Sequence, residues 1–554
     1  MSILLTTLNA KYIHSNLAIR ILYQLNKHHD HLSWKEFTIK EPIHEIAFFC
    51  SQYSLVAFSC YIWNIEQTLQ VCEAIKKINP TCKILLGGPE VSYEYELLIV
   101  KPYIDYIVVG EGEFVFQEIL SSFPRIEQIK GLVYKQNEQI VYTPNHEVFD
   151  VQLLQDINPY EDDDIDALRN KVLYIETSRG CPYKCEFCLA SLDNKVRYLP
   201  METIKKNLLF MMKHGRTIKF LDRTFNIKKD FTIAIFDFIL QHKQTENVFQ
   251  FEITADILHQ DIISFVQQKI PKGLFRFEVG IQTVNQQANL QVSRKQSFEK
   301  TTTIIKQVEQ YVDLHLDLIV GLPLDYWSDI KYSIEEVFKL FAPELQLGFL
   351  KFLKGTPMRT KAMEHNYIYE TKAPYQIIKS NYLSTEELQK IVKLEFALEA
   401  YWNKKRIINT MKYIANHHSI FDFMLGLGEY FETVSHFHKH TLEQLYTIAH
   451  DFILKHYQDK HILQLLALDY YLQHKVKPKT LFVQEVSRPE KIAFIESNRL
   501  DHHRYRFGLY QLGFDANLYV QSQVIKESKE PVVICYNGKE KPAILASMIS
   551  VSDI

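Results

Sequence analysis

The stretch Val172-Leu-Tyr-Ile-Glu-Thr-Ser-Arg-Gly180 runs directly into Cys181-Pro-Tyr-Lys-Cys185-Glu-Phe-Cys188, and this junction decides how the chain is interpreted. The first part is typical of a buried strand, and the second gathers three thiols in one short loop. A [4Fe–4S] cluster that only carries electrons is held by four thiolates, so three leave one iron free to bind another molecule. The spacing therefore predicts an iron–sulfur site at which chemistry takes place.

Two other interpretations of the three cysteines are less well supported. A zinc knuckle needs a fourth Cys or His at a comparable short spacing, and none follows nearby. Three unrelated buried thiols would not need this regular spacing. The remaining cysteines lie mostly in apolar surroundings, where a reduced core residue is expected rather than a disulfide; they are Cys50, Cys60, Cys72, Cys82 and Cys535.

The motif Cys-x3-Cys-x2-Cys, with Phe187 just before the last cysteine, resembles the signature of the radical S-adenosylmethionine (SAM) enzymes. The resemblance implies that Cys181, Cys185 and Cys188 hold a [4Fe–4S] cluster. It also implies that the amino and carboxylate groups of SAM chelate the open iron.

Six strand-like runs alternate with helical patterns between residues 171 and about 360, at residues 172–176, 217–221, 249–254, 275–280, 314–320 and 345–352. Six such units are expected for the partial (β/α)6 barrel of the radical SAM core. Active residues of such barrels lie at the carboxyl ends of the strands. By similarity to the family, Phe187 would lie near the adenine of SAM and Asp222 near its amino group. Glu252 and Gln282 would approach the ribose or carboxylate, and Asn226 is a further polar candidate.

The first 145 residues alternate strand and helix in the manner of a doubly wound α/β domain. Strands are expected at residues 3–8, 55–61, 83–86 and 104–109, and helices at residues 16–25 and 66–78. The glycines after these strands lack the third glycine of a dinucleotide fingerprint, which disfavours a Rossmann-type NAD site. An open parallel sheet nevertheless binds ligands at the carboxyl ends of its strands.

This N-terminal region resembles the cobalamin-binding domain that precedes the barrel in the B12-dependent radical SAM proteins. The candidate cobalamin-binding residues follow the strands; they are Ser59, Gly87, Gly88, Pro89, Glu111, Gly112 and Glu113. Many cobalamin domains carry Asp-x-His-x-x-Gly, whose histidine binds cobalt from below. That motif is absent, and His14 lacks the required glycine. The resemblance thus implies a cobalamin site whose lower face has no protein imidazole.

The expected fold is α/β, with a doubly wound cobalamin-binding-like domain (residues 1–145), the barrel (171–365) and a mainly helical accessory domain (366–554). Residues 146–170 contain an acidic, proline-bearing stretch that is a linker candidate, and we assign its carboxylates no chemistry. Thr441 and Gln444 predict a capping box at the start of one helix of the accessory domain.

Composition narrows the class of protein further. The chain has 554 residues and a formal net charge of −3, which argues against general nucleic-acid binding. No basic region precedes the first apolar residues and no apolar run approaches a membrane span, so we expect a cytoplasmic protein without a membrane anchor.

The family implies reductive cleavage of SAM to methionine and a 5′-deoxyadenosyl radical, which abstracts hydrogen from an unactivated carbon. Methylcobalamin would methylate that carbon, and a second SAM would remethylate the corrinoid. An external electron donor such as flavodoxin or ferredoxin is implied, and the substrate, a small molecule or a peptide, is unknown. Two alternatives stay open: a cobalamin-free radical SAM enzyme (oxidation, ring formation or sulfur insertion), and a non-catalytic iron–sulfur redox protein.

Overall fold

The computed structural model describes residues 2–145, 147–435, 440–479 and 482–545. It divides into two compact units. The first comprises Met1–Tyr326 with Gly348–Ser384, and the second comprises Trp327–Leu347 with Thr385–Ile554. Our finer division into an N-terminal domain, linker, barrel and accessory domain stays a prediction.

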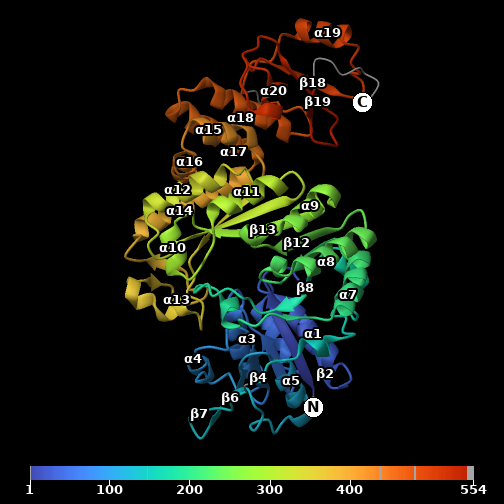
Figure 1. Cartoon of the computed structure of the whole chain (residues 1–554), viewed down its shortest axis with the longest axis vertical. Helices are drawn as coiled ribbons and strands as arrows, with labels where there is room; N and C mark the ends of the chain where they lie inside the picture. Colours follow the sequence, from blue (N-terminus) through green and yellow to red (C-terminus); the bar gives the residue numbers. More distant parts are fainter. Residues whose placement is uncertain (1, 146, 436–439, 480–481, 546–554) are drawn as a thin grey trace. The chain divides into compact units, whose positions relative to one another are not determined.

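The N-terminal region of the first unit is built on a seven-stranded sheet of order β2-β1-β3-β4-β5-β6-β7 (Figure 1). The first five of these strands pair in parallel, and β6 and β7 add an antiparallel hairpin. Helices α1 and α5 pack on one face and α2 and α3 on the other, which confirms the doubly wound fold. The strands are β1 (Ile3–Asn9), β2 (Leu32–Thr38), β3 (Leu55–Ser59), β4 (Lys83–Gly87), β5 (Tyr106–Val108), β6 (Leu132–Gln136) and β7 (Gln139–Tyr142); the helices are α1 (Leu17–Asn26), α2 (Ile43–Cys50), α3 (Ile65–Ile78), α4 (Glu96–Ile99) and α5 (Glu113–Ser122).

The second sheet of the chain has the order β15-β14-β13-β12-β11-β8, and these are the six strands that the sequence predicts. Along β12 and β13 the buried side chains alternate with partly exposed ones, so one face packs under helices and the other faces the barrel interior. The strands are β8 (Val172–Ile175), β11 (Thr217–Phe220), β12 (Val248–Glu252), β13 (Phe275–Gln282), β14 (Asp313–Val320) and β15 (Glu344–Phe349); the helices of this part are α7 (Met201–His214), α8 (Lys229–His242), α9 (Gln260–Lys269), α10 (Gln286–Gln291), α11 (Phe298–Val308) and α13 (Pro357–Thr360).

Short elements complete the first unit. Two antiparallel pairs flank the barrel strands, β9 (Ser178–Arg179) with β10 (Arg197–Tyr198), and β16 (Ile368–Tyr369) with β17 (Ile377–Lys379). Among its described residues, 147–170, the linker candidate contains the short helix α6 (Ile165–Leu168) and one 3-10 turn, Val151–Leu154.

The acidic linker stretch is docked on α1 rather than solvated throughout. Asp163 accepts two hydrogen bonds, at 2.6 and 2.9 Å, from the guanidinium of Arg20, which is 1% exposed and also pairs with Glu36 at 2.6 Å. Tyr160 is fully buried, and its hydroxyl bonds both the N–H (2.6 Å) and the carbonyl (2.9 Å) of Tyr174 in β8. The linker thus attaches the first barrel strand to the N-terminal sheet.

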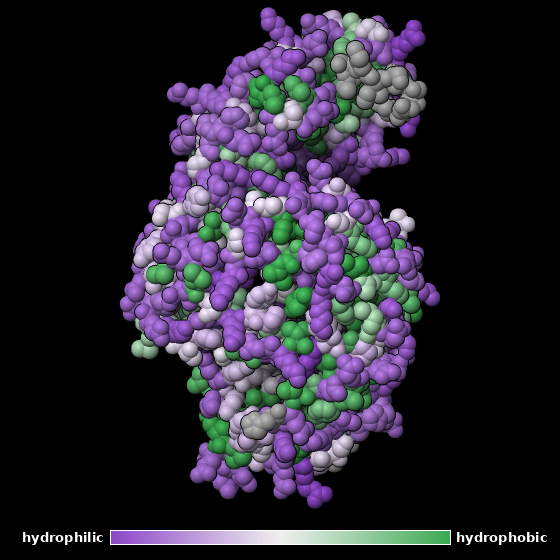
Figure 2. Space-filling model, viewed as in Figure 1, coloured by the Kyte–Doolittle hydropathy of each residue, from purple (hydrophilic) through white to green (hydrophobic). Residues whose placement is uncertain are grey.

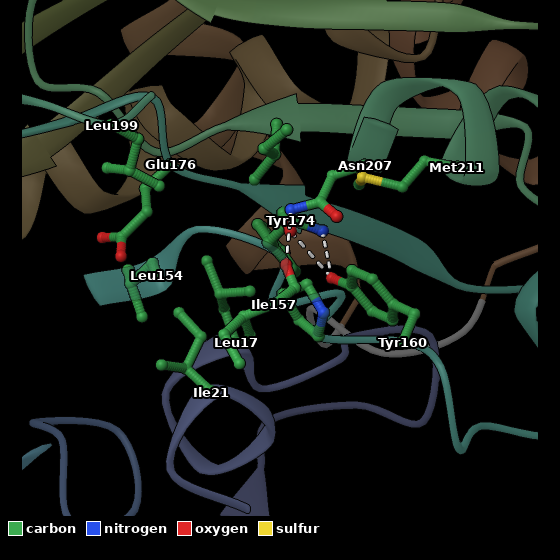
Figure 3. A pocket seen from close by; sticks show the side chains of 12 residues that line it. Leu17, Ile21, Leu154, Ile157, Tyr160, Tyr174, Glu176, Leu199, Asn207 and Met211 are labelled. Atoms are coloured by element: carbon green, nitrogen blue, oxygen red, sulfur yellow. Dashed lines mark hydrogen bonds between the residues drawn. The ribbon is translucent and has the colours of Figure 1, made fainter. Parts of the chain in front are cut away.

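Figure 3 shows this junction, with Leu17 and Ile21 of α1 on one side and Asn207 and Met211 of α7 on the other. The side chain of Tyr160 reaches into the space between them. The space left over is about 20 Å³, enough for little more than one water molecule. The junction is therefore a packed contact and not a ligand pocket.

The second unit is mainly helical, as expected. Thr441 and Gln444 form the predicted capping box at the start of α17, and a small antiparallel sheet of order β18-β19-β20 lies late in the chain. The elements are α12 (Trp327–Phe338), α14 (Thr385–Ala397), α15 (Ile408–His417), α16 (Ile420–Val434), α17 (Leu442–His456), α18 (Lys460–Gln473), α19 (Arg488–Ser497) and α20 (Ala516–Ser522), with β18 (Arg506–Tyr510), β19 (Val532–Tyr536) and β20 (Ala543–Ile544).

Among the described residues, no helix combines the length and the apolar character that crossing a bilayer requires. In the view of Figure 2, apolar side chains are interspersed with polar ones over much of the visible face.

Candidate active site

The three motif cysteines line one cavity of about 250 Å³ at the carboxyl ends of the barrel strands. Cys181 and Cys185 are each 8% exposed, Cys188 is partly exposed, and all three are free thiols. Phe187, Glu252 and Gln282 line the same cavity, so the structure brings these six predicted residues together.

Local backbone geometry explains how the cysteine loop leaves the strand. Gly180 has a φ of +92°, and a Cβ there would lie 2.5 Å from the carbonyl oxygen of Lys195. Only glycine fits both conditions. The amide of Cys181 then donates to the carbonyl of Asp193 at 2.8 Å, and the amide of Cys188 donates to that of Cys185 at 3.1 Å. The loop is thereby folded back over the barrel mouth.

The donor set of this cavity fits an iron–sulfur cluster better than a single metal ion. Within the described part of the chain, no three His, Cys, Asp or Glu side chains are gathered as a ready single-ion site. Zinc would need its sulfur ligands within about 2.3 Å of one point. Three free thiols that line one cavity are the ligand set that a multi-iron cluster with one open iron would use.

Arg294 is a cavity residue that the sequence analysis did not find. Its Nη1 lies 3.6 Å from the Sγ of Cys185, and its Nη2 donates to the carbonyl of Gly280 at 2.5 Å. Burial raises the pKa of the Cys185 thiol, and the Arg294 guanidinium counteracts that rise. Arg294 therefore favours the thiolate that binds iron. It lies far from the motif in sequence, so no local signal could have identified it.

Gln282 presents an unused hydrogen-bond acceptor to the cavity. Its Oε1 is buried without a hydrogen-bond partner, and its backbone has a φ of +69°, which is strained for a residue other than glycine. Its amide nitrogen lies over Gly280, where a Cβ would come within 2.2 Å. A buried acceptor without a partner is costly unless a ligand supplies a donor.

Among the described residues, the Glu252 carboxylate also has no close cationic partner. The Arg223 guanidinium lies nearby, with 3.8 Å between its Nη1 and the Oε1 of Glu252, a distance too long for a hydrogen bond. Burial raises the pKa of the Glu252 carboxyl, Arg223 and Lys219 oppose the rise, and the nearby Glu278 and Asp317 add to it. The carboxylate can therefore gain from an added donor.

Asp222 and Asn226 are not among the residues that line this cavity, and their approach to SAM stays a prediction. The Asp222 carboxylate is 2% exposed and accepts from the N–H (3.0 Å) and hydroxyl (2.7 Å) of Thr177 and from the hydroxyl of Ser178 (2.5 Å). The Asn226 amide both donates to and accepts from the backbone of Thr254. Their polar atoms already fasten strand ends to one another.

The candidate cobalamin residues lie on the loops after β3, β4 and β5, at the carboxyl edge of the first sheet. Gly88 has a φ of +110°, and a Cβ there would come within 2.6 Å of the carbonyl oxygen of Cys60. Ser92 joins two loops, because its hydroxyl donates to the Gly88 carbonyl and accepts from the Gly110 amide. The exposed Pro89 and the end residues Ser59 and Gly87 belong to the same edge.

Open space and apolar side chains are concentrated at this edge. A Cβ on Gly110 or Gly112 would meet nothing within 4 Å. Large apolar side chains on the loops after β1, β3 and β4 stay 37–64% exposed; they are Tyr12, Ile13, Trp63 and Tyr93. Exposed apolar groups beside open glycines fit a large planar ligand such as a corrin.

Glu111 and Glu113 bind arginines beside the cysteine loop. Arg179, two residues before Cys181, pairs with Glu113 at 2.7 Å and with Glu111 at 3.3 Å, and Arg197 pairs with Glu111 at 2.9 Å. Burial raises the pKa of the Glu113 carboxyl, and Arg179 opposes the rise. These ion pairs join the carboxyl edge of the first sheet to the cysteine loop.

His14 is engaged by the barrel. Its Nδ1 lies 2.7 Å from the hydroxyl of Tyr174, and burial lowers its pKa. This hydrogen bond accounts for one of the two ring nitrogens.

Comparison with known families and proteins agrees with this geometry. Residues 5–120 match the B12 binding domain, residues 175–337 match the radical SAM superfamily, and residues 363–505 match a family described as a protein of unknown function. A cobalamin-dependent radical SAM methyltransferase, TokK of Streptomyces tokunonensis, is 30% identical over 160 residues, which are 26% of this chain and 23% of TokK. An uncharacterized methyltransferase of Pyrococcus horikoshii is 24% identical over 380 residues, 63% of this chain and 78% of that protein.

Solved structures show the same fold. The cobalamin-dependent SAM radical enzyme OxsB, with aqua-cobalamin bound, has a TM-score of 0.60 at 15% identity and covers 85% of this chain and 79% of its own. The radical SAM methyltransferase TsrM of Kitasatospora setae has a TM-score of 0.55 at 14% identity, and the match covers 68% of this chain and 76% of the TsrM chain.

Proposed function

Because the chain belongs to the radical SAM proteins that carry an N-terminal B12 binding domain, we propose that it is a cobalamin-dependent methyltransferase acting on an unactivated carbon. The observation that carries the proposal is the attachment of the corrin-type sheet edge to the cysteine loop through Arg179, Glu111 and Glu113. Methyl transfer requires the corrin and the SAM-derived radical to reach one substrate carbon, and this attachment would hold the two proposed sites near each other.

The chain's own residues would divide the work as follows. Cys181, Cys185 and Cys188 would hold the cluster, and Arg294 favours the thiolate form of Cys185. Gln282 and Glu252 would accept hydrogen bonds from SAM, with Phe187 against its adenine. The loops that carry Ser59, Gly87, Gly88, Pro89 and Gly112 would receive the corrin.

When bound, the cluster would supply the electron for SAM cleavage, and the corrinoid would supply the methyl group. The protein contributes placement and the exclusion of water from the cavity. A radical SAM enzyme needs an external reductant, and a flavodoxin or ferredoxin is the class that we propose for it.

The first test is corrin retention. The protein is reconstituted anaerobically with iron and sulfide, incubated with excess hydroxocobalamin and desalted, and corrin absorbance is measured per chain. We expect close to one corrin per chain. Absence of retention with intact iron–sulfur absorbance would exclude cobalamin-dependent methylation and leave a cobalamin-free radical SAM enzyme.

A second measurement separates catalysis from electron transfer. The reduced, reconstituted protein is incubated with SAM, and methionine and 5′-deoxyadenosine are quantified. A redox protein without an open iron would form neither product, so their appearance excludes that alternative.

A further inference from the structure

The segment of residues 354–361, which follows β15, carries three basic side chains that each pair with a carboxylate on another loop. We call this segment the strap. Lys354 pairs with Glu90 at 3.0 Å, Arg359 with both oxygens of Glu94 at 2.5 and 2.7 Å, and Lys361 with both oxygens of Glu186 at 2.8 and 2.9 Å. Glu90 and Glu94 belong to the loop after β4, whereas Glu186 lies between Cys185 and Phe187.

The contacts with the loop after β4 are mostly buried. The side chains of Lys354 and Glu90 are 7% and 5% exposed, and the hydroxyl of Tyr375 donates to Glu90 at 2.5 Å. Gly355 has a φ of +82° and lies against the ring of Tyr93, where a Cβ would come within 2.5 Å. Removing one partner of such a buried pair strongly destabilises the protein locally, because an unpaired buried charge remains.

The contact with the cysteine loop uses both side chain and backbone. The Lys361 ammonium pairs with the Glu186 carboxylate, and the amide of Met358 donates to the Glu186 carbonyl at 3.0 Å. Glu186 also accepts from the hydroxyl of Ser293 at 3.0 Å. One short segment therefore bonds the loop after β4 and the loop that carries the cysteines.

We propose that the strap sets the spacing between the corrin and the cluster, with Arg359, Lys354 and Lys361 as positioning residues. The inference rests on the proposed function. A methyl group and a substrate radical must meet within bonding reach, and a displacement of about 1 Å can cost on the order of 100-fold in rate. A segment with ion pairs to both loops restrains that displacement without touching a reacting atom.

The test exchanges the charges of one pair in the full-length protein loaded with both cofactors. The variants are Glu94→Arg, Arg359→Glu and the double exchange, because this pair is more accessible than Lys354–Glu90 and, unlike Lys361–Glu186, lies outside the cysteine motif. The control is Arg169→Glu, which breaks an exposed surface pair with Glu246. Arg359→Lys tests whether the bidentate geometry matters beyond the charge.

Two readouts are combined. Microwave-power saturation of the cob(II)alamin EPR signal, measured with the cluster reduced, reports the magnetic coupling between the two cofactors without turnover. The ratio of methylated product to 5′-deoxyadenosine reports whether SAM cleavage is still coupled to methylation. A peptide library supplies the methyl acceptors for this second readout.

We expect each single-exchange variant to retain iron and corrin. Its cob(II)alamin EPR signal should saturate at lower microwave power, and its ratio of methylated product to 5′-deoxyadenosine should fall about tenfold. The double exchange should restore both readouts in part, because Arg359 also donates to the carbonyl of Phe352 and a glutamate there cannot. Arg169→Glu should change neither readout. Unchanged saturation in the single variants would overturn the strap's role. Loss of corrin from the single variants would also overturn this role, since the Glu94–Arg359 pair would then be needed for corrin binding and not for the spacing between corrin and cluster. A wild-type protein that retains no corrin refutes the proposed function itself, and the strap inference with it.

Discussion

Two sets of polar side chains at the barrel strand ends look alike in sequence and differ in the structure. The Asp222 carboxylate and the Asn226 amide are bonded inside the protein. Beside the cysteines, in contrast, the Oε1 of Gln282 has no partner and Glu252 has Arg223 only at 3.8 Å. Position at a strand end therefore does not identify a ligand contact. The number of hydrogen-bond partners that a side chain already has identifies ligand contacts far better, because a group with all its hydrogen bonds made gains little from a ligand.

The largest effect is expected from removing the three thiols that line the cavity together with Glu252 and Gln282. Replacing Cys181, Cys185 and Cys188 together with Ala should abolish cluster binding, since thiolates are the iron ligands. Iron and acid-labile sulfide per chain measure this, and 5′-deoxyadenosine formation should vanish with them. Cys535→Ser, in a half-buried position of the second unit, is the matched control and should keep the cluster.

Asp222 and Asn226, whose polar groups are already hydrogen-bonded, should matter for the stability of the fold. Asp222→Ala leaves the Thr177 amide and two hydroxyls without an acceptor, which should lower the local unfolding free energy by about 2–4 kcal/mol. Hydrogen exchange of the β8 amides measures the change. Glu252→Ala should alter the same amides far less, and equal effects of the two variants would remove the distinction between the sets.

Glu252 and Gln282 should matter for SAM binding. Gln282→Leu keeps the volume and removes the acceptor, so SAM affinity should fall about tenfold, or about 1.4 kcal/mol. Equilibrium dialysis with the reconstituted, oxidised protein measures the dissociation constant. Asn226→Ser is the comparison variant, and a loss of affinity there as large as in Gln282→Leu would contradict our assignment.

The smallest effect is a pH dependence. Burial raises the pKa of Asp222 to about 6, above its ordinary value of 3.8. Between these values the folded protein binds more protons than the unfolded chain, so the contribution of Asp222 to stability falls as pH rises from about 4 to 6. The difference in urea-unfolding free energy between wild type and Asp222→Asn should shrink over this range. A difference that grows with pH would mean that the three donors hold the carboxylate ionised.

Sequence reasoning succeeded where the signal is local. The six barrel strands depend on patterns among neighbouring residues, and the structure confirms them, although β8 already ends at Ile175. The edge strand β2 was missed because only two of its seven residues are buried, which leaves no alternating apolar pattern.

The remaining misses come from distant partners. The role of Asp222 depends on Thr177, 45 residues away, and that of Arg294 on Cys185, 109 residues away. Glu111 and Glu113 show the same limit, because the arginines they bind belong to the barrel. Nothing in a single sequence reports such pairings.

The buried Arg20 has a consequence for how the N-terminal domain could be reused. Its guanidinium needs Asp163 as well as Glu36, and Asp163 lies beyond the end of the doubly wound domain. A fragment cut at residue 145 would retain the arginine with half of its counter-charge and lose the buried Tyr160. In engineering or in gene rearrangement, the transferable piece therefore extends at least to residue 163, and a fusion joined earlier would begin with a destabilised module.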